Sequence, residues 1–537
     1  MQTGLATDPS GTPPGNTSRP LAAQAQIEAL LAMVASQSER IEALTRQLDW
    51  FKQQLFGTKS EKRHLGGDEQ QLNLGQTFEA KAPAEAPASL VKPHQRRRAT
   101  RGADESAQPF FDESRVPIET IVLPCPLTAG LDEAEIARRF ECIGQKHTFR
   151  LAQRPGSFVV LKYERAQYKE RETGLIGCAA APLGVIEGSR ADVSFIAAMA
   201  IDKVAYHLPL YRQHQRLADA GFKVSRPWLT QLMQQAAELI RPIYEAQFDS
   251  VRLSRIKAMD ETPIRAGLAA PGKMNQGYFW PVYGELDEVC FAFHPSRNYE
   301  NVTASLGLKV PEDSVLLSDG YGAYEAYASK MRIRHARCWA HARRYYFRAK
   351  EVEPQAAEEA MQMIAALYQI EALIKERRLS GEAKRAHRVE HSKPVVDAFF
   401  AWVTERFESQ GLLPSNPLTK ALAYARAARR GLEVFLTDPD VPIDTNHLER
   451  ALRVIPLGKK NWMFAWTELG ARHIGMLNSL IVTCRLHKVD PYDYLVDVLQ
   501  RIGVHPNHRV SELTPRLWKQ HFADDPMRSD LYHLGRH

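Results

Sequence analysis

The sequence predicts a multidomain protein of combined α+β and α/β class. With 537 residues the chain is too long for one ordinary hydrophobic core, so we expect about three or four folded units. Hydrophobic residues make up 44% of the chain, which also contains eight tryptophans, so much of it should be globular. Helical periodicity alternates with short β-rich runs, and two of these runs end at an aspartate.

Charge and cysteine content favour a protein from the interior of a cell. Lys and Arg total 70 against 63 Asp and Glu, and this net charge of +7 favours an anionic partner only weakly. The six cysteines are scattered without a CxxC pair, which indicates reduced thiols. The N-terminus lacks a signal sequence and no uncharged apolar run approaches the ~20 residues of a membrane span, so we expect a cytoplasmic protein without membrane contact.

The N-terminal part predicts a segment for self-association. After a Gly/Pro/Ser/Thr-rich leader at 1–20, residues 21–65 carry apolar side chains at alternating steps of three and four. This seam of about four heptads predicts a coiled coil or an antiparallel helix pair; the alternative is one amphipathic helix lying on the body of the protein. The seam consists of Ile27, Leu30, Val34, Ile41, Leu44, Leu48, Phe51 and Leu55, with Gln37 in its one polar slot.

A basic linker follows at 66–115. It contains few large apolar residues and is expected to be flexible. A basic patch on a flexible tether suits transient contact with phosphates, and a linker that is charged only to stay soluble is the equal alternative. The patch consists of Arg96, Arg97, Arg98 and Arg101.

Residues 116–187 are strand-like, and residues 188–250 are helical. In the helical part a first helix should end near Gly221, and Ser225 is a suitable N-cap for a second helix with Pro227 in its first turn. The spacing fits a DNA-reading helix-turn-helix, although ordinary helical hairpins are commoner. The exposed start of the second helix would offer Arg226, Trp228 and Thr230.

Residues 251–350 predict a mixed five-stranded sheet. The run RIKAMDETPIRA is a short strand ending at Asp260, GYFWPVYGELDEVCFAFH gives two strands joined by a turn, and SVLLSDGYGAYEAYAS is a buried strand ending at Asp319 before a helix. RIRHARCWAHARRYYFRAKE adds a fifth strand and a basic helix. The two aspartates are therefore expected at the ends of the first and fourth strands.

The remaining segments are predicted to be mostly helical. Residues 351–440 are rich in Ala, Glu, Arg and Leu, and they separate the sheet from a helix in DTNHLERALRVIPLGKKNWMF. That helix begins 441–500, the second part of the sheet domain with C-terminal helices, and 501–537 is expected to be a tail. It surrounds Glu449 with Arg450, Arg453, Lys459 and Lys460.

Asp260, Asp319 and Glu449 are candidate metal ligands. Converging carboxylates repel one another unless a cation neutralises them, and hard oxygen ligands suit Mg²⁺ or Mn²⁺. Two such ions would promote an in-line phosphoryl displacement, while the basic residues around Glu449 hold a DNA backbone. The alternatives are aspartates that cap turns and a glutamate that forms an ion pair.

Four stretches together resemble the catalytic domain of the insertion-sequence-sixty-six family of bacterial transposases: MDETPIR, LLSDGYGAYEAY, RHARCWAHARRYYF and IDTNHLERALRVIPLGKKNWMF. The match extends to KVAYHLPLYRQHQRLADAGFKVSRPWL, RQLDWFKQQLFGTKSEKR and VDPYDYLVDVLQRIGVHP, so it covers most of the chain in order. The resemblance implies a ribonuclease-H-like core with an Asp-Asp-Glu triad at Asp260, Asp319 and Glu449. Residues 351–440 are then a helical insertion into this core.

The resemblance implies a DNA transposase. Such a protein binds the ends of an insertion sequence, cleaves a phosphodiester there with two Mg²⁺ or Mn²⁺ ions, and joins the freed 3′-hydroxyl to target DNA. A homodimer or higher oligomer, small accessory proteins of the same element and association with the nucleoid are further expectations. The alternatives are a non-catalytic DNA-binding relic or repressor and a DNA nuclease of the same fold.

Two smaller patterns leave alternatives open. His335, Cys338 and His341 have the spacing of a metal motif, but they straddle a strand-to-helix boundary without an evident fourth ligand, so packing is the favoured role. Trp462 and Phe464 would stack on a base at an open DNA end or, as the favoured role, cover the sheet.

One departure from the family concerns zinc. Its members usually carry two CxxC pairs ahead of the catalytic domain, whereas here Thr128 stands at the position that should pair with Cys125, and Glu170 and Thr173 fill the second pair. A structural zinc site needs four ligands in tetrahedral array. We therefore predict that 116–187 folds without zinc, through strand pairing and turns. Elemental analysis of the purified chain should find no stoichiometric zinc, and one zinc per chain would contradict the prediction.

Overall fold

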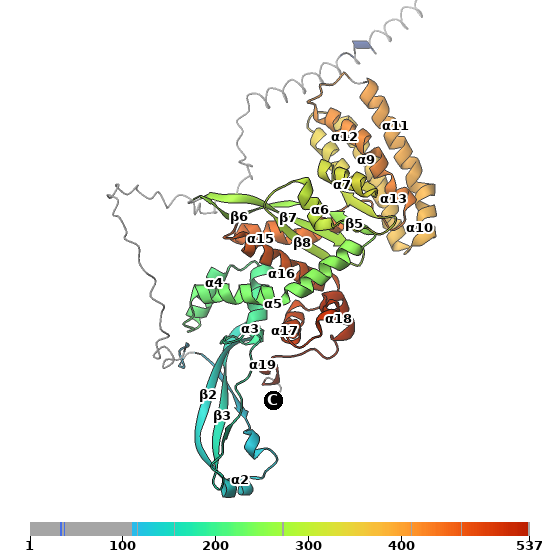
Figure 1. The fold of residues 1–537 in the computed structure, drawn as a ribbon. Coiled ribbons are helices and arrows are strands. Elements are labelled where there is room, and N and C mark those ends of the chain that lie inside the picture. The colour runs from blue at the N-terminus through green and yellow to red at the C-terminus, as the bar shows by residue number, and fades with distance from the viewer. Residues whose placement is uncertain are drawn as a thin grey trace, which may run out of the picture. The chain divides into compact units, whose positions relative to one another are not determined.

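The computed structural model describes residues 110–534, except 115, 155, 271–272, 410 and 463, together with 33, 34 and 37 (Figure 1). The predicted leader, almost all of the heptad segment and most of the basic linker with its four arginines lie outside the described residues. The chain divides into two compact units. The larger unit contains all three candidate acids and consists of 103–344, 363–408 and 423–537.

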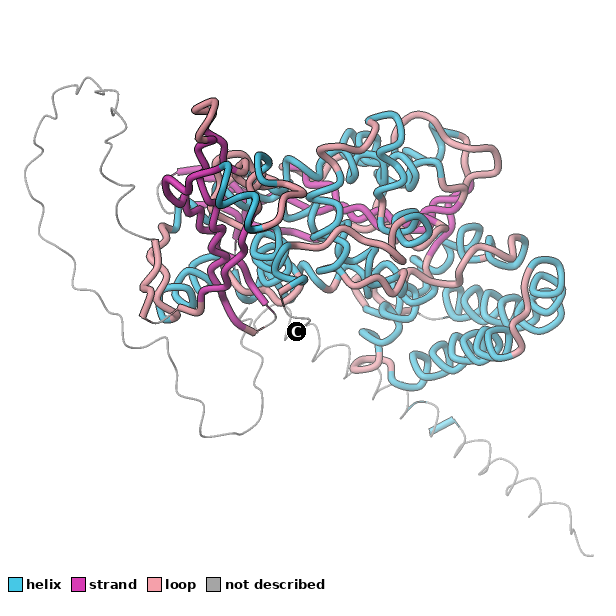
Figure 2. Tube along the Cα trace, turned by 90° about the horizontal axis from the view of Figure 1, so that it is seen from below, coloured by secondary structure: helices cyan, strands magenta, loops and turns pink. Residues whose placement is uncertain are grey.

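Residues 116–187 contain a four-stranded sheet, as their pattern predicts. β3 pairs with β2 in a long antiparallel hairpin (magenta in Figure 2), with β1 in parallel and with β4 antiparallel. Successive side chains of β3 are buried on opposite faces, so Leu161 packs with Leu531 while Val160 joins the adjoining helical core. The elements are β1 (Ile118–Leu123), η1 (Pro126–Thr128), α2 (Glu133–Arg139), β2 (Phe140–Arg154), β3 (Ser157–Glu170) and β4 (Ile176–Cys178).

Three helices follow, and the predicted turn between two of them is present. α4 ends before Gly221, whose φ of 95° lies in the left-handed region that glycine favours. Ser225 caps α5, because its Oγ accepts a hydrogen bond from Trp228 N at 3.3 Å. The apolar side of α5 joins the core around α3 first and the core of the central sheet near its end. The helices are α3 (Val193–Val204), α4 (Leu210–Asp219) and α5 (Arg226–Leu253).

The central sheet has seven strands instead of the expected five. The predicted strands are present as β5, β7, β8, β9 and β10, with helices after the last three in the expected order. β6 and β11 are additional. The bounds are β5 (Ile256–Met259), β6 (Thr262–Ala270), β7 (Lys273–Gly284), β8 (Val289–His294), α6 (Tyr299–Leu306), β9 (Val315–Ser318), α7 (Gly322–Met331), β10 (Arg334–Arg337), α8 (Trp339–Ala349) and β11 (Phe464–Ala465).

β5 and β6 are two halves of one extended run. Both pair antiparallel with β7 in a single register, since Met259 pairs with Val282 and Thr262 pairs with Phe279, three residues away on each strand. The run changes its other neighbour between the halves: β5 pairs in parallel with β9, and β6 pairs in parallel with β11. The predicted short strand that ends at Asp260 is present as β5, whereas β6 was not expected and forms because β7 is long enough to pair with both. The change of neighbour, from β9 to β11, occurs at Asp260.

Residues 351–440 are helical, as predicted. Trp339, at the start of α8, is buried among three phenylalanines of this region, with ring centroids 5.2 to 6.5 Å away: Phe399, Phe400 and Phe435. In the smaller unit, Asn416 Nδ2 donates to Glu353 Oε1 at 3.4 Å. The elements are α9 (Pro354–Glu376), α10 (Gly381–His387), the π-helix η2 (Arg388–Ser392), α11 (Lys393–Ser409), α12 (Pro417–Leu432) and α13 (Val434–Thr437).

Residues 501–534 are folded, so the prediction of a C-terminal tail was wrong. The segment has few apolar residues, but Trp518 and Leu531 are buried, and Trp518 Nε1 donates to Asp497 Oδ1 at 3.0 Å. None of the helices in the described ranges is long and apolar enough to cross a membrane. The last elements are α14 (Asn446–Leu452), α15 (Val454–Trp462), α16 (Glu468–Leu486), α17 (Pro491–Arg501), η3 (Asn507–Leu513), α18 (Pro515–His521) and α19 (Asp530–His533).

α16 covers the outer edge of β8. Phe291 N donates to Ser479 Oγ at 2.8 Å, and Val289 N donates to Thr483 Oγ1 at 3.2 Å. Gly475 lies one turn earlier on the same helix face, and a Cβ there would be 2.4 Å from Phe291 O. The helix therefore approaches the strand closely and satisfies amides that an open edge would leave unpaired.

Gly475→Ala should destabilise the fold. In an ordinary helix this change stabilises by about 0.5–1 kcal/mol, but here the new methyl group meets a main-chain oxygen that cannot rotate away. We expect a loss of about 1–3 kcal/mol, seen as a lower thermal unfolding temperature. Gly322→Ala is the control, because nothing lies within 4 Å of that Cβ position in α7. An unchanged melting temperature for Gly475→Ala would contradict the close packing of α16 on β8.

Candidate active site

Asp260 and Asp319 lie at the same end of two neighbouring strands. β5 and β9 pair in parallel with Ala258 opposite Leu317, and each aspartate follows two residues later. Because both strands run in the same direction, the two acids reach the same edge of the sheet. The predicted placement of these two residues at the ends of adjacent strands is confirmed.

Main-chain amides orient both aspartates. Asp260 Oδ1 accepts a hydrogen bond from Glu261 N, and Asp319 Oδ1 accepts one from Tyr321 N, both at 2.8 Å. The cations of this region pair with two other acids, Glu261 and Glu449. Neither aspartate forms an ion pair with another residue in the described part of the chain.

Glu449 reaches the site from α14. The start of this helix is fastened to the end of β10, because Thr445 N and Thr445 Oγ1 both donate to Cys338 Sγ at 3.3 Å. Arg344 Nη2 on α8 then donates to Glu449 Oε1 at 3.2 Å. This placement brings Glu449, a residue far along the sequence, within electrostatic reach of Asp260.

The electrostatics of the site centre on Asp260. Its pKa is raised to about 7, first by burial and then by the negative charges of Glu261, Asp319 and Glu449, while the hydrogen bond from Glu261 N opposes the shift. The other acids are therefore within electrostatic reach of Asp260. A divalent cation would relieve both the burial cost and the repulsion, and the oxygen donors suit Mg²⁺ or Mn²⁺.

The three predicted acids do not form a compact ligand set. Across the described residues, no group of three or more His, Cys, Asp or Glu side chains is arranged to hold a metal ion. Glu449 contributes less to the shift at Asp260 than the other two acids, and its Oε1 is engaged by Arg344 and lies 3.9 Å from His341 Nε2. The carboxylate donors are of the type that fits a hard cation.

Glu261 is a fourth carboxylate that the sequence analysis did not select. Its side chain is 6% exposed, forms an ion pair with Arg297 and accepts a hydrogen bond from Tyr324 OH. Burial raises the pKa of Glu261, while Tyr324 and Arg297 oppose that shift. The one local signal was its position beside Asp260, because both partners are distant in the sequence.

The basic residues predicted to contact DNA have different surroundings. Lys459 Nζ donates to Pro263 O at 2.8 Å, so this lysine fastens α15 to β6. The guanidinium of Arg226 lies 5.6 Å from the ring centroid of Tyr211. The other three cations of α14 and its continuation do not contact the aspartates, and DNA contact remains a prediction for all of them. The exposed members of the set are Arg226, Arg450, Arg453 and Lys460.

Both tryptophans predicted to contact DNA make packing contacts. Trp462 is half-buried, and its ring lies against its own helix, since a Cβ at Gly458 would be 2.4 Å from Trp462 Cζ2. Trp228 is half-buried and stacks on Phe195 with ring centroids 6.0 Å apart. The ring of Trp462 thus packs on its own helix, and the ring of Trp228 packs on α3.

His335, Cys338 and His341 serve different neighbours. His335 Nε2 lies 2.8 Å from Ser318 Oγ, the buried Cys338 contacts Thr445 at the start of α14, and His341 faces Glu449. They belong to no metal-binding group among the described residues. The packing role that the sequence analysis favoured agrees with these contacts.

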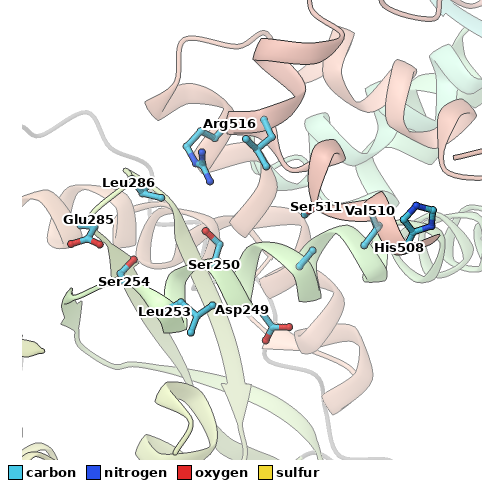
Figure 3. Close-up of a pocket in the computed structure, with 12 residues that line it drawn as sticks. Asp249, Ser250, Leu253, Ser254, Glu285, Leu286, His508, Val510, Ser511 and Arg516 are labelled. Carbon is cyan, nitrogen blue, oxygen red and sulfur yellow. The ribbon is translucent and has the colours of Figure 1, made fainter. Parts of the chain in front are cut away.

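A cavity of about 540 Å³ lies between the end of α5 and η3 (Figure 3). Ser250, Leu253 and Arg516 line it, and the charge of Arg516 is matched by the buried Glu288, whose Oε1 accepts from Arg516 Nε at 3.0 Å. None of the three candidate acids lines this cavity. The candidate active site is therefore separate from this cavity and lies at the edge of the sheet where β5 and β9 end.

Comparison with protein families identifies the class of this chain. Residues 188–473, more than half of the chain, match the model of the transposase IS66 family, and the protein belongs to that family. Residues 479–516 match the IS66 C-terminal element. Residues 43–106 match a model described as Transposase C of IS166 homeodomain, which overlaps the predicted heptad segment and linker.

Similar proteins occur in Sinorhizobium fredii (strain NBRC 101917 / NGR234). The uncharacterized protein y4hP is 28% identical over 89% of each chain, and the uncharacterized protein y4qI is 28% identical over 91% of each chain. The uncharacterized protein y4jD is 30% identical over 361 residues, which cover 64% of this chain and 69% of y4jD. The similarity therefore extends beyond the sheet to nearly the full length.

Asp260→Asn should stabilise the fold at neutral pH in the absence of divalent cations. The pKa of about 7 lies above the ordinary 3.8, so the folded state loses stability as pH rises from about 4 to 7, and the amide removes this loss. The shift corresponds to ~4 kcal/mol at most. In thermal melts the variant should exceed wild type near pH 8 and match it near pH 4, while the exposed control Asp397→Asn shows no such gain. A lower melting temperature for Asp260→Asn at pH 8 would disprove that the buried, ionised carboxylate destabilises the fold.

Proposed function

We propose that this family member is a catalytically competent DNA transposase with a ribonuclease-H-like core, in which Asp260, Asp319 and Glu449 form the Asp-Asp-Glu triad. The observation that carries the proposal is the pair of aspartates at the ends of adjacent parallel strands, with Glu449 in electrostatic reach. The family resemblance also implies acids directly after the first and fourth strands of a five-stranded core.

The reaction is phosphoryl transfer on DNA. A water oxygen bonds to phosphorus, the P–O3′ bond breaks, and the leaving oxygen takes a proton, which yields a 3′-hydroxyl and a 5′-phosphate. In strand transfer that hydroxyl attacks a target phosphorus and displaces the target 3′-oxygen, which takes the proton. One or two Mg²⁺ or Mn²⁺ ions bound by the triad would supply the Lewis acid for both displacements. The amides of Glu261 and Tyr321 hold the aspartates in place.

DNA binding is expected to rest on exposed cations and on N-terminal segments. Arg450, Arg453 and Lys460 offer charge next to the triad, and Arg226 offers it at the start of α5. The homeodomain-described match at 43–106 includes the basic patch of the linker. We further propose a homodimer or higher oligomer through 21–65, accessory proteins of the same element, and action at the nucleoid in the cytoplasm.

A cleavage assay tests the proposal. Purified protein is incubated with labelled DNA that carries the terminal repeat of the element or a scrambled repeat, with Mg²⁺ or EDTA. We expect Mg²⁺-dependent nicking at the repeat boundary, at least ~10³-fold slower in Asp319→Asn and Glu449→Gln, with end binding retained. Glu433→Gln is a matched control, because Glu433 also pairs with an arginine, Arg429, at 2.9 Å.

Each other outcome points to a different function. Nicking by Glu449→Gln at the wild-type rate would refute the triad. Specific binding by wild type without cleavage would favour a DNA-binding relic, and cutting of branched DNA irrespective of the terminal sequence would favour a nuclease.

A further inference from the structure

We propose that Arg297 binds a nonbridging oxygen of the scissile DNA phosphate, and that Glu261 holds Arg297 in position and is not a further metal ligand. The inference deepens the function proposed above and rests on it. It concerns the one buried carboxylate of the site that is already paired with a cation.

Two chains of contacts link Arg297 to the two catalytic aspartates, one through Glu261 and one through Tyr321. Arg297 Nη2 pairs with Glu261 Oε1, and the amide of Glu261 donates to Asp260 Oδ1. On the other side, Tyr321 OH donates to Arg297 O at 3.2 Å, and Tyr321 N donates to Asp319 Oδ1. Movement of Arg297 is thus coupled to the same two loop residues whose amides orient the aspartates.

The guanidinium is held near the acids but stays open to solvent. Its Cζ lies 4.2 Å from the ring centroid of Tyr321, and the side chain is 41% exposed. Burial lowers the pKa of Arg297, but the charges of Glu261 and Asp319 raise it above its ordinary value, so the group is always cationic. The ion pair with Glu261 uses Nη2, and a guanidinium has further N–H donors for a phosphate.

The contacts of Glu261 fit a residue that positions Arg297 and do not fit a metal ligand. Its Oε1 contacts Arg297 and its Oε2 accepts from Tyr324 OH, and Tyr324 is itself fully buried. Both oxygens are therefore engaged in a rigid setting, whereas the main-chain bonds of Asp260 and Asp319 involve Oδ1 alone. The two aspartates have the oxygen atoms to offer a cation.

An arginine in this position supports the chemical step. When the water oxygen attacks and the P–O3′ bond breaks, negative charge is spread over the nonbridging oxygens of the phosphate. A preorganised guanidinium there stabilises the transition state more than the bound substrate. The four carboxylates around the site would otherwise repel the phosphate, so a fixed cation among them also favours approach of the DNA.

Arg297→Gln should slow cleavage of terminal-repeat DNA by about 10²-fold, with a small change in the affinity for that DNA. Arg297→Lys keeps the charge beside Glu261 and should recover part of the rate. The log–log salt slope of DNA binding should fall by about 0.9 in Arg297→Gln, as for one lost phosphate contact. Arg385→Gln is the matched control: Arg385 is 45% exposed and paired with Glu382, and its loss should change neither the rate nor the slope.

Glu261→Gln tests whether Glu261 positions Arg297 or binds Mg²⁺. Mg²⁺ should raise the thermal unfolding temperature of Glu261→Gln and of wild type by similar amounts, whereas Asp260→Asn should lose most of that response. Loss of the Mg²⁺ response in Glu261→Gln, or an unchanged rate and salt slope in Arg297→Gln, would overturn the proposal. If wild type bound DNA without cutting it, the proposed transposase activity would fail, while the salt slope and the Mg²⁺ response would still decide the roles of Arg297 and Glu261.

Discussion

The burial of the Asp260 carboxylate among other acids is the constraint on which the arrangement of this site depends. Burial and three neighbouring negative charges together raise the pKa of Asp260 to about 7. The site keeps this unfavourable charge because Asp260 and Asp319 are tied to main-chain amides and cannot turn away. A buried carboxylate held in this way requires a stable surrounding scaffold.

The scaffold supports the third acid through the helical insertion. Arg388 in η2 is fully buried, pairs with Glu371 at 2.8 Å, and donates to Phe435 O at 2.8 Å and Val441 O at 3.1 Å. The chain that returns from the insertion toward α14 is therefore fastened before it reaches Glu449. The insertion is part of the support for the site, and this role is compatible with its distance from the aspartates in the sequence.

Arginines at the rim of the site compensate only part of the negative charge. Arg344 pairs with Glu449 and Arg297 pairs with Glu261, and their side chains are 48% and 41% exposed. Both cations thus pair with glutamates and leave the aspartates unpaired. Glu449, the acid at the centre of the basic stretch, pairs with Arg344 of α8, while Arg450 and Arg453 are exposed.

The sequence by itself determined the features whose causes lie within a few residues of each other. Ser225 and Gly221 mark helix ends through their own backbone chemistry, and the buried strands before Asp260 and Asp319 are visible as short apolar runs. The likeness of whole motifs also identified the family.

Only the tertiary structure decided what depends on partners far along the chain. The continuation of β5 into β6 needs the length of β7, the pairing of Glu261 needs Arg297 and Tyr324, and the packing of Trp228 needs Phe195. The segment that was expected to be a tail likewise forms helices, because Trp518 is buried against the rest of the fold. Local periodicity indicates backbone preference and burial. Which distant residues come into contact is decided only when the whole chain packs together.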